Sequence, residues 1–380
     1  MLGTRGIPAA YSGFETAVEH LAEQFSGRGH DVTVYCRPHM VDKVDEYVGA
    51  RLVHLPTVQN KYLDTLAHTA ICTAHMVTRR RPDVAIYFIS GNAPVVPLAR
   101  LGRVPTVFQI DGLDSQRAKW PKLAKRYLRF AERIAPEAAT ITVTDSESVA
   151  EAFEGAYGRR IVAIPYGAEV TDPGSAGWCR RLDLEPGRFV LFVGRLVPEN
   201  NAHLVVQAHR DSECDWPLVI VGDAPYAQEY IASLKEMAGP DVRFPGYVFG
   251  DGYGELIHRA GIMCAPTEVG GTHPVIIEAL AAGAPLIVSD HPPNLEAVGD
   301  AADAFPLADG AAGLARAIDV LAGDVRRRAE LSRRAMERAA SHFSWDRCAE
   351  RYLALCELAV ARARGRGRPQ VSTGSSSASR

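Results

Sequence analysis

Two glycine-containing turns in the second half of the sequence could bind phosphate. The apolar run FVLFVG ends at Gly194 and is followed by Arg195, and an arginine at the end of a buried strand can hold a diphosphate through two N–H donors. Gly270, Gly271 and Thr272 follow the run IMCAP and precede a helical pattern, so their N–H groups could surround a phosphate. A surface arginine is the simpler interpretation of Arg195 taken alone.

Glu278 lies about two turns into the helix that follows the diglycine. A carboxylate at that place can accept hydrogen bonds from two hydroxyls, such as those of a ribose. Taken alone, a glutamate on a helix is more often solvated. The diglycine, the helix, Glu278 and the following run AAGAPLIVSD together form a far more specific pattern than any one of them.

A glycine-rich turn also opens the first half of the chain. The segment GTRGIPAAYSGFE contains Gly3, Gly6 and Gly13, which allow tight turns and close backbone approach. The helix predicted to open at about Gly13–Glu15 would offer unpaired N–H groups to an anion. A plain turn into a helix is the alternative, and the spacing is not the GxGxxG of dinucleotide-dependent dehydrogenases.

A basic stretch occupies positions 117–133. It holds seven basic residues against one acid, Glu132: Arg117, Lys119, Lys122, Lys125, Arg126, Arg129 and Arg133. Most of them share one helical face, with Trp120, Leu123, Tyr127 and Leu128 at neighbouring positions. Such a helix could rest on anionic lipid or hold a lipid diphosphate. A solvated basic face is the alternative.

The elements that must position these residues alternate between strand and helix patterns, which predicts parallel α/β sheets. Strands are expected at 31–36, 84–90, 105–111, 139–145, 161–165, 189–194, 217–223, 242–248, 262–266 and 285–290. The looser stretch 171–187 predicts the domain linker, and 345–363 predicts a last helix. The Gly-, Ser- and Arg-rich segment 364–380 predicts a disordered tail. Only Met1 and Leu2 precede the first glycine, so the first strand is expected to be either stunted or partly missing.

Composition excludes several classes of protein. The chain has 380 residues, 47% hydrophobic, 23% charged, with a net charge of −3, which predicts about two globular domains and argues against a dedicated nucleic-acid binder. The seven cysteines are scattered and never spaced CxxC, so no disulfide framework, structural metal or catalytic metal is expected. No apolar run approaches a membrane span, and no signal-peptide core precedes the first domain, which predicts a cytoplasmic location. The oligomeric state is left open.

The chain resembles glycosyltransferase family 4, which has the GT-B fold. The run from Ile277 to Ile287 (IEALAAGAPLI) resembles the family's LEAMAxGxPVV signature, and the segments GTRGIPAAYSGFE, DGLDSQRAKW, IPYGAE, GRLVPENN and EVGGTHP resemble a bacterial rhamnosyltransferase-like subgroup. The resemblance spans roughly residues 2–360. It implies two Rossmann-like domains facing across a cleft, at 1–170 for the acceptor and 187–343 for the nucleotide sugar, with the helix 344–363 crossing back onto the N-terminal domain.

The resemblance also implies roles for the candidate residues. Donor binding is expected from the C-terminal half and from Gly13, through these residues: Arg195, Asn200, Gly270, Gly271, Thr272 and Glu278. Arg195, Asp111 and Glu268 are the candidate catalytic residues, and Arg195 with the diglycine amides would stabilise the leaving diphosphate. Arg5, Glu15, Asp111 and Arg117 are expected to bind the acceptor. Asp111, at the end of a predicted strand, could alternatively cap a helix.

Two positions depart from the family pattern. Asn200 stands where the family has a lysine that helps to hold the diphosphate, so one cation is lost unless another basic residue replaces it. Glu268 lies two residues further from Glu278 than the family's paired glutamates do, so it would meet the donor sugar only if the turn bulges.

The predicted function is therefore a retaining, metal-independent transfer of a hexosyl group from a nucleotide diphosphate sugar, with no cofactor. The acceptor would be a saccharide, a lipid-linked sugar or a small molecule. Two alternatives remain: a non-catalytic nucleotide-sugar-binding protein with a decayed site, and a nucleotide-sugar epimerase on the same fold.

Overall fold

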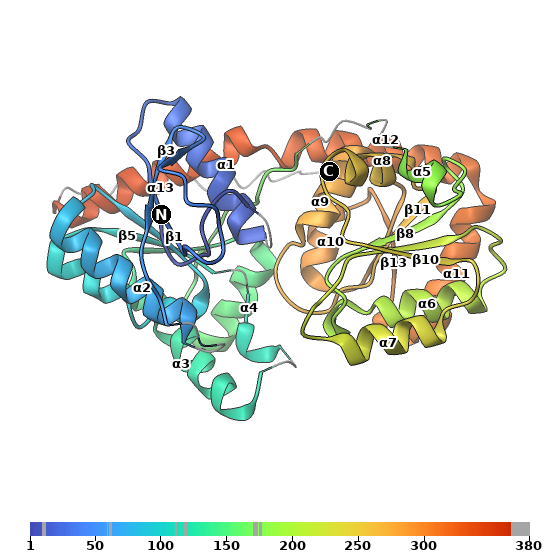
Figure 1. Ribbon diagram of the computed structural model, residues 1–380, viewed down its shortest axis with the longest axis horizontal. Coiled ribbons are helices and arrows are strands. Elements are labelled where there is room, and N and C mark those ends of the chain that lie inside the picture. Colours follow the sequence, from blue (N-terminus) through green and yellow to red (C-terminus); the bar gives the residue numbers. More distant parts are fainter. Residues whose placement is uncertain are drawn as a thin grey trace, which may run out of the picture.

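The computed structural model describes residues 1–9, 13–58, 60, 63–110, 112–117, 120–169, 174 and 177–365. Two α/β lobes lie side by side along the long axis of the molecule (Figure 1). The helices are α1 (Gly13–Gly27), α2 (Asp64–His75), α3 (Lys122–Ala138), α4 (Glu147–Tyr157), α5 (Trp178–Arg181), α6 (Ala202–Asp211), α7 (Gln228–Met237), α8 (Asp251–Arg259), α9 (Pro274–Ala282), α10 (Pro292–Val298), α11 (Gly310–Gly323), α12 (Val325–His342) and α13 (Trp345–Ala363).

The strands form separate sheets in the two lobes. They are β1 (Thr33–Cys36), β2 (Glu46–Tyr47), β3 (Ala50–His54), β4 (Ala85–Phe88), β5 (Thr106–Gln109), β6 (Ile141–Thr144), β7 (Val162–Ala163), β8 (Val190–Val193), β9 (Leu218–Val221), β10 (Val242–Gly246), β11 (Ile262–Ala265), β12 (Leu286–Ser289) and β13 (Asp303–Phe305). The N-terminal lobe holds β1-β3-β2 and β4-β5-β6-β7, and the C-terminal lobe holds β10-β9-β8-β11-β12-β13. The pairs are parallel except for β2–β3. This architecture confirms the predicted GT-B-like α/β class.

Met1 and Leu2 join the two N-terminal sheets. The Tyr35 amide of β1 donates to the Met1 carbonyl (3.0 Å), and the Leu2 amide donates to the Ile86 carbonyl of β4 (3.0 Å). Leu2 is buried and forms a parallel bridge with Tyr87. These two residues therefore occupy the place of a short first strand between β1 and β4.

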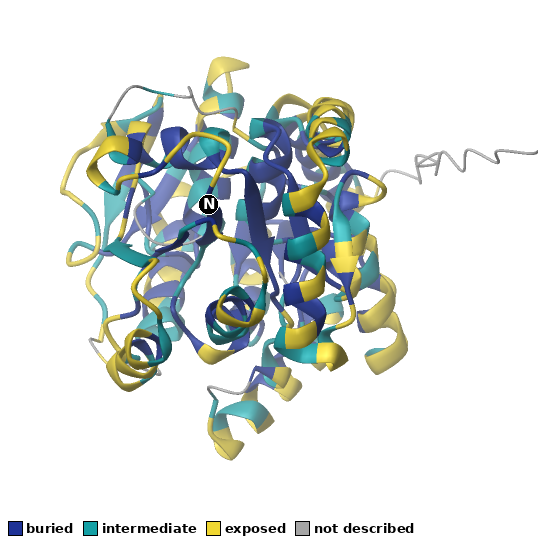
Figure 2. Cartoon of the chain, turned by 90° about the vertical axis from the view of Figure 1, so that its right-hand side faces the viewer, coloured by how far each residue is buried: buried dark blue, intermediate teal, exposed yellow. Residues whose placement is uncertain are grey.

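The central strands of the sheets are buried, with helices packed over them. Figure 2 shows buried residues along the strands and exposed residues on the outer faces of the helices. Strands such as β6 and β9 are buried along their whole length, as expected for parallel sheets packed on both sides.

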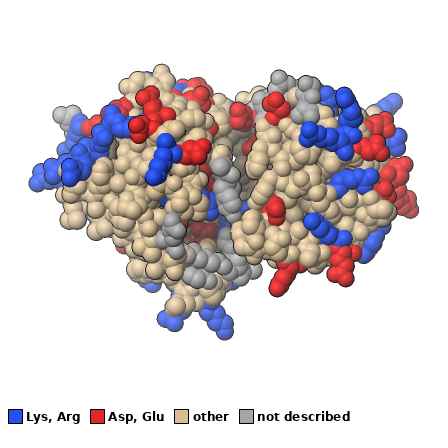
Figure 3. All heavy atoms as spheres, viewed as in Figure 1, with Lys and Arg blue, Asp and Glu red and all other residues tan. Residues whose placement is uncertain are grey.

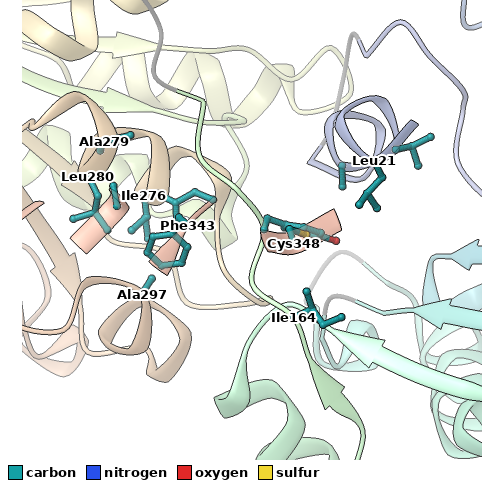
Figure 4. Packing of buried hydrophobic residues seen from close by; sticks show 14 of the residues in the cluster. Leu21, Ile164, Ile276, Ala279, Leu280, Ala297, Phe343 and Cys348 are labelled. Atoms are coloured by element: carbon teal, nitrogen blue, oxygen red, sulfur yellow. The ribbon is translucent and has the colours of Figure 1, made fainter. Parts of the chain in front are cut away.

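The last helix crosses back to the N-terminal lobe, as the resemblance implied. Phe343, after α12, packs with Ile276 of α9 and with Ala297 of α10, whereas Cys348 lies toward Leu21 and Ile164 of the N-terminal lobe (Figure 4). Helix α13 packs on α1 and on β5. One apolar cluster thus runs from one lobe into the other through the crossover.

Two of the predicted segments lie outside the two domains: the linker and the C-terminal tail. The predicted linker 171–187 contains the short helix α5, whose first two amides donate to Glu255 of α8 at 2.9 and 3.1 Å, so part of this stretch is ordered against the C-terminal lobe. The predicted disordered tail lies outside the described residues from position 366 onward. The domain boundaries themselves stay predictions.

Candidate active site

A cavity of about 990 Å³ lies between the two lobes. The furrow between the lobes is visible in the space-filling view (Figure 3). The predicted site residues that line the cavity are Gly13, Arg117, Arg195, Asn200, Gly270, Gly271, Thr272 and Glu278. They come from loops at the carboxyl ends of parallel strands and from helix N-termini, where open α/β sheets bind their ligands.

Helices α1 and α9 approach each other across this cavity with their N-terminal ends. A methyl group placed on Gly13 would lie 2.8 Å from Cγ of Pro274, the first residue of α9. A side chain at position 13 would therefore push the lobes apart. Both helix ends carry N–H groups without intrahelical partners, which favour an anion in the space that they border.

Arg195 brings an unpaired positive charge into the cavity. It follows Gly194 at the end of β8, and its guanidinium makes no hydrogen bond or ion pair with any other residue in the described part of the chain. The turn is tight: a Cβ on Gly222, which has φ of +134°, would lie 1.9 Å from the Gly194 carbonyl oxygen. A free guanidinium in a largely protein-lined cavity is a strong anion-binding group.

Asn200 stabilises this turn without supplying a charge. Its Nδ2 donates to the Arg195 carbonyl oxygen at 2.8 Å, and the residue is buried. The amide therefore fixes the backbone that carries Arg195, while the positive charge of a lysine is missing from this position.

The diglycine turn leads from β11 into α9. The Gly270 carbonyl oxygen lies 3.1 Å from Nε2 of His291. Next to it, burial and the neighbouring positive charges lower the pKa of His273 to about 3, so this imidazole is neutral at physiological pH. The His273 Nε2 atom is buried without a hydrogen-bond partner among the described residues, and the side chain lines the cavity. A buried polar atom of this kind is satisfied by a ligand or by water.

Glu278 shares a hydrogen bond with a buried tyrosine. Tyr253 of α8 donates its hydroxyl to Oε2 of Glu278 at 2.5 Å. Burial raises the pKa of Glu278, and the bond from Tyr253 opposes that effect. Burial and the neighbouring carboxylate raise the pKa of Tyr253, so its hydroxyl stays protonated and remains the donor. One carboxylate oxygen is thus held by the protein, and the other is available to a ligand.

Arg117 reaches across the cleft from the N-terminal lobe. Its Nη1 donates to Oε1 of Glu199 in the C-terminal lobe at 3.1 Å, and its Nε donates to Oδ1 of Asp114 at 2.8 Å. Arg117 and Glu199 are both buried. The resemblance places Arg117 with the acceptor, but its contacts place it beside the loop that carries Arg195.

Three predicted residues that the structure describes, Arg5, Glu15 and Glu268, do not line the cavity. Glu15 is buried and accepts a hydrogen bond from the Arg5 amide at 3.0 Å, so it fixes the glycine-rich turn of its own lobe. Glu268 is exposed beside the diglycine and does not line the cavity. Asp111 lies outside the described residues, and a Cβ on its neighbour Gly112 would lie 3.4 Å from the diglycine backbone. The roles expected for these residues stay predictions.

Several cavity residues were missed by the sequence analysis. Asp145 follows β6, is buried and lines the cavity; the rule applied to other strands, which is to examine the residue directly after the strand, would have found it. Tyr166, in the segment IPYGAE, is buried and accepts a hydrogen bond from Nε2 of Gln109 at 3.0 Å. Tyr253 carries no motif, and His273 lies within the segment EVGGTHP without being singled out there, so the three-dimensional packing is what indicates these two residues.

Comparison with known proteins gives this geometry a family context. Residues 12–167 match the family described as Glycosyl transferase 4-like domain, and residues 181–338 match the family described as Glycosyl transferases group 1. The two matches indicate a GT-B glycosyltransferase. The rhamnosyltransferase-like subgroup stays a prediction.

Relatives and solved structures agree with this assignment. The chain is 26% identical over 398 residues to glycogen synthase of Mycobacterium tuberculosis, covering 96% of this chain and 94% of that protein. Sucrose-phosphate synthase from Thermosynechococcus elongatus has the same fold, with a TM-score of 0.81, 19% identity and coverage of 95% and 98% of the two chains. HepE of Anabaena, solved in complex with UDP and glucose, gives a TM-score of 0.73 at 17% identity, covering 93% and 98%. These likenesses agree with the two glycosyltransferase family matches, and the solved structures show the same fold.

The described residues contain neither a candidate membrane-spanning helix nor a candidate metal cluster. No helix in the described part of the chain combines the length and hydropathy needed to cross a membrane. Among the same residues, no group of three or more His, Cys, Asp or Glu side chains could hold a metal ion.

Proposed function

We propose that this glycosyltransferase moves a hexose from a nucleotide diphosphate sugar to a saccharide, lipid-linked or small-molecule acceptor, with retention of configuration and without a metal. The observation that carries the proposal is the cavity that holds three groups together: the unpaired Arg195, the diglycine turn before α9, and Glu278. A cation, a set of N–H donors and a carboxylate match a diphosphate and a ribose. UDP and UDP-glucose complexes of HepE, a protein of similar fold, support the same substrate class.

The chemistry would depend on stabilising the leaving group. As the bond between the sugar and the diphosphate breaks, negative charge builds up on the phosphate that leaves. Arg195 and the amides of Gly270 and Gly271 would stabilise that charge, because they are already oriented and need no rearrangement. The leaving phosphate would accept the proton of the acceptor hydroxyl as that hydroxyl attacks from the same face. Glu268 would contact the donor sugar if the diglycine turn moves it inward.

The N-terminal lobe would present the acceptor. Its side of the cavity begins at Gly13, where α1 opens toward α9. Asp111, which ends the predicted strand of this lobe, would orient the acceptor hydroxyl, and Arg5 and Glu15 would shape the turn around it. Approach of the two lobes would exclude water and limit hydrolysis of the donor.

Helix α3 supports contact with an anionic membrane surface. Leu123 is 77% exposed and Phe130 is 54% exposed, and the basic residues Lys122, Arg126, Arg129 and Arg133 are exposed on the same helix. Figure 3 shows Lys and Arg side chains at the lower end of the N-terminal lobe, where α3 lies in Figure 1. Apolar side chains between basic ones are typical of helices that lie in a lipid interface. The proposed enzyme would thus act at the cytoplasmic face of a membrane.

A donor panel tests the proposed function. The protein is incubated with UDP-, GDP- and dTDP-sugars, with and without simple saccharide acceptors, and release of the nucleoside diphosphate is measured. Release from one donor that increases with acceptor supports the proposal. Conversion of the donor to an isomeric sugar nucleotide without acceptor would indicate an epimerase. Absence of binding to every donor would indicate a decayed site and would refute the proposal.

A further inference from the structure

We propose that His273 binds the sugar part of the donor, with its Nε2 atom accepting a hydrogen bond from a hydroxyl of the transferred sugar. The inference rests on the proposed function and deepens it, because it names a residue that selects among nucleotide sugars. His273 directly precedes α9 and lines the cavity between the lobes. Glu268 would reach the donor sugar only after a movement of the diglycine turn, whereas His273 needs no such movement.

The two ring nitrogens of His273 differ in their partners. Nε2 is buried and makes no hydrogen bond with any described residue. A buried polar atom of this kind costs free energy unless a ligand or water satisfies it. The imidazole is also hydrogen-bonded to the backbone of Val269, and since Nε2 has no partner, this bond is made by Nδ1. One nitrogen therefore fixes the ring in the turn, and the other can accept a bond from a ligand.

Protonation makes Nε2 an acceptor. Nδ1 carries the ring proton, because it donates to the backbone. The charged or titratable groups that face the ring are Arg117, His291 and Arg195. Burial above all, and then these neighbours, lower the pKa of His273 to about 3, so Nε2 stays unprotonated at neutral pH. An unprotonated nitrogen binds an O–H or N–H group but not an ionised phosphate, which has no hydrogen to donate.

The absence of a side chain at position 270 leaves space beside Nε2. Gly270 has φ of +114°, and a Cβ placed on it would lie 3.8 Å from Nε2 of His273. A side chain at this position would occupy space from which a hydroxyl can approach the ring. The N–H groups of the diglycine suit a phosphate, and Nε2 adds an acceptor that suits a hydroxyl.

The order of the groups in a nucleotide sugar places the transferred sugar on this side of the site. Ribose, diphosphate and sugar follow one another, and the proposed site has Glu278 for the ribose and Arg195 with the diglycine for the diphosphate. His273 precedes Glu278 by five positions, which is about 7 Å along the axis of α9, and it adjoins the diglycine turn. We therefore expect Nε2 to meet a sugar hydroxyl close to the leaving phosphate.

Calorimetry that compares nucleoside diphosphates with nucleotide sugars tests this role. The ligands are UDP, GDP and dTDP, each beside a sugar derivative: UDP-glucose, GDP-mannose and dTDP-rhamnose. His273→Met and His273→Gln form a matched pair, because both remove the imidazole, have similar shapes, and differ in that Gln keeps an acceptor. His273→Met should bind the nucleotide sugar about two- to tenfold more weakly, the range for a neutral hydrogen bond, with unchanged affinity for the nucleoside diphosphate. His273→Gln should retain most of the affinity for the nucleotide sugar.

Analogues of the bound donor that lack one sugar hydroxyl identify the partner of Nε2. One of them should bind the wild type more weakly than the parent donor does. His273→Met should bind that analogue and the parent donor equally, because both changes remove the same hydrogen bond. In the wild type, the ratio of the two affinities should stay constant from about pH 5 to 8, where an ordinary histidine would titrate.

His291→Gln is the control for the turn. Nε2 of His291 lies 3.1 Å from the Gly270 carbonyl oxygen, and His291 does not line the cavity, so this variant should change both affinities by the same factor. Wild-type protein that binds neither nucleotides nor nucleotide sugars would refute the proposed function itself. The role of His273 alone would be refuted by unchanged or equal affinities in His273→Met, by the same selective loss in His273→Gln, or by a selective loss in His291→Gln.

Discussion

Replacing Glu278 with glutamine should make the protein more stable and a weaker binder of its donor. The substitution keeps the shape of the side chain and leaves an amide oxygen that can accept the bond from Tyr253. It removes the carboxylate charge, which the folded protein holds in a buried position. Because burial raises the pKa of Glu278 above its ordinary value, the ionised carboxylate disfavours folding.

The sign of the pH dependence follows from this shift. A carboxyl group with a raised pKa in the folded state favours folding below its unfolded pKa and loses that contribution as the pH rises through the folded pKa. At neutral pH the Gln variant should therefore have a free energy of unfolding about 0.5–2 kcal/mol higher than the wild type, which is the usual range for a single stabilising substitution. The difference should vanish below the ordinary pKa range of a glutamate.

Donor affinity should change in the opposite direction. A hydroxyl bonded to a carboxylate contributes about 1.5–3 kcal/mol, and one bonded to a neutral acceptor about 0.5–1.5 kcal/mol. Since Tyr253 already holds Oε2, we expect one strong bond to the ribose through Oε1 and a loss of about 1–1.5 kcal/mol. That loss is about a five- to twelvefold rise in KM for the donor, with kcat little changed, because the ribose is remote from the reacting bond.

Two assays decide the outcome: thermal unfolding across the pH range, and steady-state kinetics with the donor identified by the panel. Tyr253→Phe is the companion variant. It removes the hydrogen bond that lowers the pKa of Glu278, so loss of donor binding on acidification should begin at a higher pH than in the wild type. A stabilised Glu278→Gln protein with unchanged KM would refute the ribose assignment. A destabilised one would show that the carboxylate is structural.

Three further predictions concern the lobes and their surfaces. Gly13→Ala should lower kcat/KM with little change in thermal stability, because its Cβ would lie 2.8 Å from Pro274 across the cleft; full activity would contradict this close approach. Glu296→Gln should cost about 1 kcal/mol, the value of a helix cap, and should widen the distribution of lobe positions in small-angle scattering, because its two oxygens accept the first amides of α4 at 2.7 Å each; an unchanged scattering curve would show that this contact does not hold the lobes. Leu123→Ser with Phe130→Ser should reduce sedimentation with vesicles of anionic lipid and leave turnover of a soluble acceptor intact, whereas equal sedimentation would leave α3 a solvated basic face.

The sequence predicts the buried strands well because their signal is local. Runs such as FVLFVG and PLVIVGD are apolar along their whole length, as parallel strands covered on both faces must be, and both appear as strands of the C-terminal sheet. Strands β2, β3 and β13 are not among the predicted strands. Strands β2 and β13 are edge strands of two and three residues, and β3, although central in its sheet, alternates buried and exposed positions, so none of the three has the continuous apolar run that marks the other strands.

The same distinction between local and non-local signals applies to the candidate site. Arg195 and the diglycine could be located because each follows a recognisable strand, and strand ends define the ligand edge of such a sheet. The partners of these residues could not be located. Glu199 pairs with Arg117 across 82 positions of sequence, and Tyr253 meets Glu278 across 25. Glu15 is buried and accepts a hydrogen bond from the Arg5 amide, a contact that the sequence does not show, and its expected role toward the acceptor stays a prediction.

The distribution of contacts between the lobes indicates where the enzyme bends. At the crossover the contact is apolar: Phe343 packs with Ile276, and Trp345 would lie 2.3 Å from a Cβ on Gly167. Along the cleft the described contacts are polar, through Glu199 and through Glu296. Separating the apolar contact would expose apolar surface to water, which costs free energy in proportion to the area exposed. The polar groups can replace their hydrogen bonds to each other with hydrogen bonds to water, so separating them has a small net cost. The lobes should therefore open by pivoting about the crossover, so that the largest displacement falls at the cleft, where Arg117 pairs with Glu199.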